Sequence, residues 1–297
     1  MGTRMDIVFW GLERRFAHLV FQELFNKVNW LESIYSRFDE NSTISQINAS
    51  AGLHPVEISE EVYAVLKLCK HYHALTNGIF DVTFLSVSDP NRNIKGNKTT
   101  QKTAIDLTHE KTGMDKLKLD PYKSTAYLEE KGMSIDLGGI GKGIALERID
   151  QILSAKGVNH AFISFGESSI LAKGRHPYGN CWKLGIRHID DNSLNVYAFE
   201  LKDLSLSTSG NHSSESKDII NPKTGHAPDE VCTVSVVSKS PTEAEVLSTA
   251  LLLSSQEETQ QIIYNFNPDQ VIEIDYMDKS HYINELYIKK ADTKTSA

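Results

Sequence analysis

The sequence of 297 residues has little of what marks several common protein classes. Its three cysteines lie far apart and are odd in number, which argues against a disulfide framework and a cysteine metal site. No apolar run reaches the ~18 residues that a membrane-spanning helix needs. Lysine and arginine number 31 against 39 acidic residues, and no basic run is present, so nucleic-acid binding is not indicated. These absences leave a globular protein of ordinary composition.

Linkers, repeats and a leader are missing as well. No Gly/Ser-rich or Pro-rich stretch divides the chain, so we expect a single domain over residues 1–291 and a disordered tail over 292–297. Residues 1–30 lack the charged-then-apolar pattern of a leader. We therefore expect a cytoplasmic protein, or an extracytoplasmic, membrane-associated one if a leader has been removed.

A glycine-rich stretch organises the sequence, in residues 134–150 (SIDLGGIGKGIALERID). Alternating apolar residues predict a strand, four glycines predict a turn, and the spacing that follows predicts a helix. In that geometry backbone N–H groups and a helix N-terminus can face an anion, and Lys142 adds a positive charge. The spacing is neither a Walker loop nor a dinucleotide fingerprint, so a turn without a ligand stays open. Asp136 before the glycines favours a metal ion or a ring N–H held there as well.

The remaining apolar spacing predicts a mixed α+β fold. Helices are expected over residues 13–31, 59–76, 241–254 and 256–265. Strands are expected over residues 5–10, 161–165, 182–189, 196–201, 204–209, 231–237, 270–275 and 281–288, and a strand is expected to start in 78–83. Residues 33–48 are expected to be polar and turn-rich, and residues 86–104 an exposed loop. Ser240, Pro241 and Glu243 predict a capping box at the start of the third helix.

Polar residues in the 241–254 helix are candidates for chemistry. Glu245, Ser248 and Thr249 fall on one helical face, where a carboxylate and hydroxyls could together hold a hard cation. A solvated face of an amphipathic helix is the simpler explanation for this helix taken alone. Asp81 could likewise only cap a turn, and Asp136 could only bind the glycine amides. Function becomes the stronger interpretation when these segments are considered together.

Taken together, these segments resemble the ApbE-type FAD:protein FMN transferases, also called flavin transferases. The resemblance spans nearly the whole chain, and the motifs follow the order of the family. The matching segments are residues 1–3 (MGT), 38–48 (FDENSTISQIN), 78–83 (GIFDVT), 136–143 (DLGGIGKG), 208–210 (TSG), 219–225 (IINPKTG) and 245–249 (EVLST). Each motif is weak alone, but this succession is hard to obtain by chance.

The resemblance implies a single α+β domain of duplicated, T-fold-like design, with mixed or antiparallel sheets and flanking helices. It also implies an FAD site and one Mg²⁺, with Ca²⁺ as an alternative. The residues implied for FAD are Met1, Phe38, Ile79, Phe80, Asp81, Asp136, Lys142 and Ile219. The residues implied for the metal are Gly139, Glu245, Ser248 and Thr249. Lys142 and Asp218 are the implied catalytic residues.

The implied reaction moves FMN from FAD onto a Thr or Ser hydroxyl of a partner flavoprotein and releases AMP. Two residues depart from the family pattern: Glu245 stands where Asp is usual, and Asp218 stands where His is usual. Mg²⁺ tolerates little change in ligand length, whereas Asp218 can still accept a proton. An FAD-binding protein without chemistry and an FAD pyrophosphatase, which makes FMN and AMP without an acceptor, are therefore the alternatives.

Overall fold

The structure is a computed structural model. It describes residues 2–84, 112–191, 193–211, 219–225, 227–228, 230–277 and 280–289. The expected loop at 86–104 and the expected tail at 292–297 lie outside these ranges, and the extent of the single domain stays a prediction.

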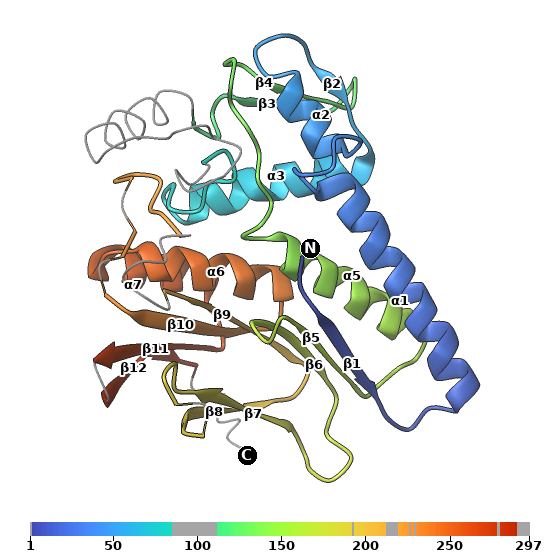
Figure 1. The fold of residues 1–297 in the computed structure, drawn as a ribbon, viewed down its shortest axis with the longest axis vertical. Coiled ribbons are helices and arrows are strands. Elements are labelled where there is room, and N and C mark those ends of the chain that lie inside the picture. The colour runs from blue at the N-terminus through green and yellow to red at the C-terminus, as the bar shows by residue number, and fades with distance from the viewer. Residues whose placement is uncertain are drawn as a thin grey trace, which may run out of the picture.

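A seven-stranded antiparallel sheet forms the centre of the fold (Figure 1). Every neighbouring pair in it is antiparallel, which confirms the α+β class; a duplicated design stays a prediction. In sheet order the strands are β1 (Met5–Phe9), β5 (Ala161–Phe165), β6 (Ser169–Lys173), β9 (Leu204–Gly210), β10 (Cys232–Ser238), β11 (Gln270–Met277) and β12 (Ser280–Ile288).

Helices cover one face of this sheet. The helices α5 (Gly141–Ala155) and α6 (Pro241–Leu253) pack directly on it, and α1 (Arg14–Tyr35) and α3 (Glu60–Leu75) lie beyond them (Figure 1). The remaining elements on this side are α2 (Thr43–Ala49), α7 (Gln256–Phe266) and the small sheet β2 (Val56–Glu57), β4 (Thr125–Leu128) and β3 (Leu117–Asp120). None of the helices in the described ranges is both long enough and apolar enough to cross a membrane.

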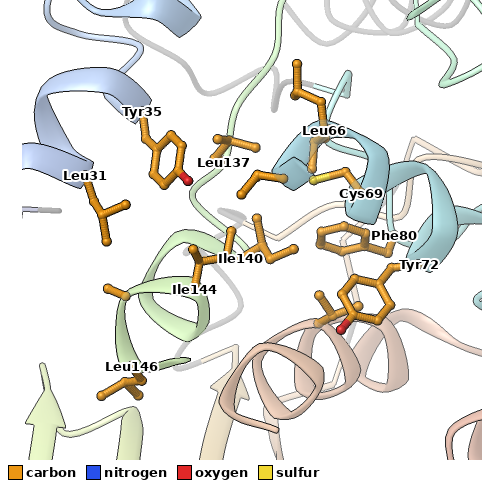
Figure 2. Close-up of a cluster of buried hydrophobic side chains, with 14 of the residues drawn as sticks. Leu31, Tyr35, Leu66, Cys69, Tyr72, Phe80, Leu137, Ile140, Ile144 and Leu146 are labelled. Carbon is orange, nitrogen blue, oxygen red and sulfur yellow. The ribbon is translucent and has the colours of Figure 1, made fainter. Parts of the chain in front are cut away.

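The main core lies among these helices. Figure 2 shows how α1 brings Leu31 and Tyr35, and α5 brings Ile144, toward side chains from the neighbouring segments. Leu31 and Ile144 are almost entirely buried there. Full burial of such a side chain contributes about 1.5–3 kcal/mol, so this shared core holds the start of α5 firmly in place.

The opposite face of the sheet is covered by a hairpin, β7 (Trp182–Arg187) with β8 (Asn195–Leu201) (Figure 1). A second apolar cluster lies between hairpin and sheet and includes Trp182, Phe199, Leu201, Leu206 and Ile272. This cluster attaches the hairpin mainly through β8 and the first residue of β7.

Two predicted strands are wrong. Residues 78–83 and 133–137 are not strands, and their contact includes a backbone bond in which Asp136 N donates to Val82 O at 2.8 Å. Ile135 and Leu137 are buried while Asp136 between them is partly exposed. The alternation of buried and exposed residues is therefore real, although the segment is not a strand. It reflects an extended segment that crosses the core, with helices rather than strands beside it.

Other departures are local. Residues 33–48 are more helical than expected, because α1 continues to Tyr35 and Ser42 caps α2 by accepting from Ser45 N at 3.0 Å. The strand β6 was not predicted. Ser240 does cap α6, but the capping box is wrong, since the side chain of Glu243 accepts from Ser238 Oγ at 3.2 Å instead of reaching the cap.

Candidate functional site

A cavity of about 440 Å³ lies where the start of α5, one face of α6 and the end of β9 meet. The segments that line it are far apart in sequence: residues 79–84, the glycine turn at 136–142, residues 208–210, residues 219–222, and α6. The sequence-predicted residues on its wall are Ile79, Phe80, Asp81, Asp136, Gly139, Lys142, Ile219, Glu245 and Thr249. The fold therefore brings most of the predicted site together.

Asp136 shapes the glycine turn and is also tied to a distant segment. Its Oδ1 accepts from Gly138 N at 2.8 Å, and its Oδ2 accepts from Arg37 Nε at 2.9 Å. The helix α5 then begins at Gly141 without a side-chain cap. Gly141 N donates to Leu137 O at 2.7 Å, which leaves the next backbone N–H groups of the first turn without a side-chain acceptor. Such groups carry a partial positive charge that suits a phosphate.

Asp81 does cap a turn, as the simpler interpretation held. Its Oδ1 accepts from Thr83 N at 2.7 Å and from Thr83 Oγ1 at 2.6 Å, while Oδ2 faces His73 Nδ1 at 3.6 Å. Burial raises the pKa of this carboxyl, because desolvation disfavours its charged form. The same residue lines the cavity, so the turn and the cavity wall are one structure.

Lys142 and Glu245 form an ion pair across the cavity. Lys142 Nζ donates to Glu245 Oε1, although the two residues are 103 positions apart. Gly143 allows this approach, since a Cβ there would lie 2.8 Å from Pro241 O and 2.9 Å from Glu245 Cβ. The helices α5 and α6 can therefore cross closely enough for the pair to form.

A row of hydroxyl groups holds the other side of Glu245. Its Oε2 accepts from Ser169 Oγ at 2.5 Å and from Ser207 Oγ at 3.2 Å, both from the sheet beneath α6. Ser209 Oγ lies 2.9 Å from Ser248 Oγ and 3.2 Å from Thr249 Oγ1. Glu245 and Ser248 are buried, so this side of α6 is not a solvated face.

Four of the residues predicted from the sequence do not line this cavity or are not among the residues that the structure describes. Phe38 is exposed and outside the cavity wall, with its ring 4.1 Å from the guanidinium of Arg37. Ser248 lies beneath the wall, where it donates to Ser207 Oγ at 3.1 Å. Met1 and Asp218 are outside the described residues.

Sequence analysis missed Arg37, Ser169 and Ser207. Ser205, Ser207 and Ser209 repeat with a period of two on β9, which is the signal that one face of this strand is lined with hydroxyls. Ser169 and Arg37 gave no comparable signal, because each acts through a partner that is distant in sequence.

The residues present fit a hard cation. Glu245, Thr249 and Gly139 line one cavity and offer carboxylate, hydroxyl and carbonyl oxygens, the ligands that Mg²⁺ and Ca²⁺ prefer. No cluster of three or more His, Cys, Asp or Glu side chains suited to a metal occurs in the described part of the chain. A bound cation would have to share the Glu245 carboxylate with Lys142 or displace it.

Comparisons with solved structures agree with the fold described above. A flavin transferase ApbE from Vibrio cholerae superposes with a TM-score of 0.80 at 21% identity, over 96% of this chain and 94% of that one. An ApbE protein from Thermotoga maritima superposes with a TM-score of 0.79 at 22% identity, over 96% of this chain and 94% of that one. These similarities concern the fold.

Sequence relatives extend over most of the chain. An FAD:protein FMN transferase from Treponema pallidum is 25% identical over 281 residues, which is 84% of this chain and 75% of the relative. One from Escherichia coli K12 is 21% identical over 281 residues, with 89% and 79% covered. The model of the ApbE family matches residues 1–272. The chain therefore belongs to the ApbE family.

Proposed function

We propose that this protein transfers FMN from FAD to a Thr or Ser hydroxyl of an acceptor flavoprotein and releases AMP. The observation that carries the proposal is the meeting, in one cavity, of a helix start without a side-chain cap, an ammonium group and a set of oxygen atoms from separate segments. Transfer at phosphorus needs positioning and charge neutralisation more than covalent help, and these groups supply both. The names of the curated relatives support the transfer of FMN from FAD to a protein.

In the proposed reaction the acceptor oxygen forms a bond to the phosphorus of the FMN half, and the bond from that phosphorus to AMP breaks. Lys142 and the first N–H groups of α5 would neutralise the phosphate charge. Glu245, Thr249, Ser248 and the Gly139 carbonyl are the proposed ligands of Mg²⁺ or Ca²⁺, which when bound would supply Lewis-acid stabilisation of that charge. The hydroxyl proton would pass to Asp218, proposed as general base.

The FAD contacts are part of the proposal. Ile79, Phe80, Asp81, Asp136 and Ile219 are proposed to contact the cofactor from the cavity wall. Phe38 is proposed to contact it from outside that wall and is exposed enough to do so. Met1, which is outside the described residues, is proposed as a further FAD contact.

One observation favours a second candidate, an FAD-binding protein without chemistry. Both oxygens of Glu245 already have partners within the protein, one in Lys142 and the other in Ser169 and Ser207. A carboxylate so engaged is less available to a metal ion than a free one. A pyrophosphatase remains the third outcome of the experiment.

The deciding experiment mixes the protein with FAD and Mg²⁺, with and without a synthetic library of extended peptides that carry a central Thr or Ser. Flavin bound covalently to peptides, with AMP released, supports the transferase. AMP and FMN formed equally without peptide identify the pyrophosphatase. Intact FAD that stays bound under every metal identifies the binding protein, and then the roles given to Asp218 and Lys142 are wrong.

The first testable prediction concerns Asp136. We expect Asp136→Ala to weaken FAD binding by ~1–3 kcal/mol, the range for loss of a charge-assisted hydrogen bond at a partly buried site. Titration of FAD fluorescence measures this. Asp120→Ala is the control, since Asp120 Oδ1, like Asp136 Oδ1, accepts from a backbone N–H two residues later, but Asp120 lies in the small sheet, away from the cavity. Equal affinity in both variants would mean that the glycine turn is only structural.

A further inference from the structure

A second cavity, of about 650 Å³, lies on the other face of the central sheet, between that face and the hairpin β7–β8. Figure 1 shows this hairpin on the side of the sheet that faces away from α5 and α6. No residue proposed above for FAD or for the metal ion lines it. We call this cavity the hairpin groove.

The two walls of the hairpin groove differ in kind. The sheet contributes alternate residues, such as Phe162 and Ser164 from β5 and Leu206 and Thr208 from β9, so this wall is a sheet face. The hairpin contributes four consecutive residues of β7, Leu184 to Arg187. Consecutive residues along one strand line a cavity when the edge of the strand, with its backbone N–H and C=O groups, faces it.

That edge of β7 has no strand beside it in the described part of the chain. β7 pairs with β8 alone, and no other described backbone bond involves Leu184 to Arg187. In an antiparallel pair, every second residue directs its N–H and C=O away from its partner strand. An unpaired edge of this kind is a template for an additional strand.

The hairpin groove adjoins the cavity of about 440 Å³ that is proposed above to bind FAD, here called the FAD cavity, at the end of β9. Thr208 and Gly210 line both cavities, and Thr208 N donates to Ser168 O at 2.8 Å. At this junction Glu167 has a φ of 63°, a left-handed conformation that is strained in a residue other than glycine. Such conformations concentrate at ligand sites, and Glu167 lines the hairpin groove.

We propose that the hairpin groove binds the acceptor: an extended polypeptide segment that adds as a strand to the free edge of β7. Apolar side chains of the segment would pack on Phe162 and Leu206, and its Thr or Ser would reach the FAD cavity past Thr208 and Gly210. This inference rests on the proposed function, because only a group transfer to protein requires a polypeptide beside FAD. Main-chain pairing gives affinity with little dependence on sequence, and the pockets between the walls select side chains.

The charges at the groove fit a segment with charges of both signs. Asp6 lines it from β1, Glu167 from the turn between β5 and β6, and Arg187 from the edge of β7. Asp6 is already paired with Arg4 at 2.6 Å, so Glu167 and Arg187 are the charges we assign to the acceptor. A basic side chain near the reacting hydroxyl and an acidic one farther along would match them.

The test uses the peptide library with a central Thr or Ser, together with FAD and Mg²⁺. Ser164→Trp fills the hairpin groove from the sheet side, and Arg187→Glu reverses the charge on its edge. Lys183→Glu is the matched control, because Lys183 is exposed on the same strand but does not line the groove. We expect Ser164→Trp to lower the rate of flavin transfer to peptide about tenfold or more, equal to ~1.4 kcal/mol. FAD affinity should remain within about twofold of the wild type, well under 1 kcal/mol.

Arg187→Glu keeps the test informative if Ser164→Trp fails to fold, and we expect it to change which peptides are selected. A second measurement is hydrogen exchange of the β7 amides, which should slow when a selected peptide is added. If neither variant changes the rate of flavin transfer and the peptide does not protect the β7 amides, the hairpin groove does not bind the acceptor. The proposed function would then still stand. Loss of FAD affinity in Ser164→Trp would show that the groove holds part of the flavin instead. No transfer by the wild type would overturn the proposed function, and the acceptor role of the groove with it.

Discussion

The consecutive helices α6 and α7 show how differently one chain can use the same local signals. In α7, Ser255 and Glu258 form a capping box, and Ile262 and Ile263 are the residues it buries. In α6, Ser240 also caps the helix, but side chains are buried on nearly every side, and these include Glu245 and Ser248. A helix that buries a carboxylate violates the usual pattern, and this violation marks the site.

The difference between the two helices lies in their surroundings. The ion pair of α7, Lys223 with Glu258 at 2.8 Å, is near the surface, where such pairs contribute little. The ion pair of α6, Lys142 with Glu245, lies against the sheet and is supplemented by serine hydroxyls. Substituting a glutamate should therefore lower the free energy of unfolding strongly in α6 and weakly in α7, and the predictions below test that contrast.

The largest effect is expected for Glu245→Ala. The change removes the partner of Lys142 and leaves the hydroxyls of Ser169 and Ser207 without their acceptor. We expect a loss of about 2–4 kcal/mol in the free energy of unfolding, measured by urea denaturation. Metal-dependent turnover should fall as well, and adding Thr249→Ala should change it little, because groups that serve one ion are not additive.

Glu257→Ala in the first turn of α7 is the control for Glu245→Ala. Glu257 is exposed, so its loss should change the free energy of unfolding by no more than about 0.5 kcal/mol. Equal effects of the two substitutions would contradict the contrast between the helices. Turnover that persists in EDTA would leave Glu245 a structural role only.

A medium effect is expected where α5 meets α6. Gly143→Ala would place a Cβ 2.8 Å from Thr242 Cα, a distance at which the helices must separate. We expect a loss of about 1–3 kcal/mol in the free energy of unfolding, and weaker metal-dependent turnover as Lys142 moves from Glu245. Gly141→Ala is the matched control in the same turn, since no atom lies within 4 Å of its added Cβ. It should be neutral or stabilising by up to about 1 kcal/mol; similar losses for both glycines would mean that helix contact does not explain them.

Local signals predicted much of this fold. Apolar spacing and caps were enough to predict α3, α6 and α7 and most strands of the central sheet. The same signals failed at residues 78–83 and 133–137. An extended segment and a β-strand show the same alternation of apolar and polar residues, and they differ only in whether another strand lies beside them. The residues of the candidate site also fall into two groups. Glu245 and Asp136 were recognisable in sequence, whereas Ser169 and Arg37 act through contacts that only the fold creates.

The smallest effect is expected in α7 and depends on pH. The Lys223 side chain and Ser255 N–H bind Glu258 and lower the pKa of its carboxyl to about 2, below the 4.5 expected without them. A lowered pKa means that the charged form stabilises the folded state, so the contribution is complete above about pH 4.5 and is lost as the pH falls toward 2. Screening near the surface limits it to under about 1 kcal/mol. Glu258→Gln should therefore lower the free energy of unfolding slightly at pH 7 and not at pH 2, whereas Glu257→Gln should change it at neither. If Glu258→Gln lowered the free energy of unfolding at pH 7 as much as Glu245→Ala does, the contrast between the two helices would be wrong.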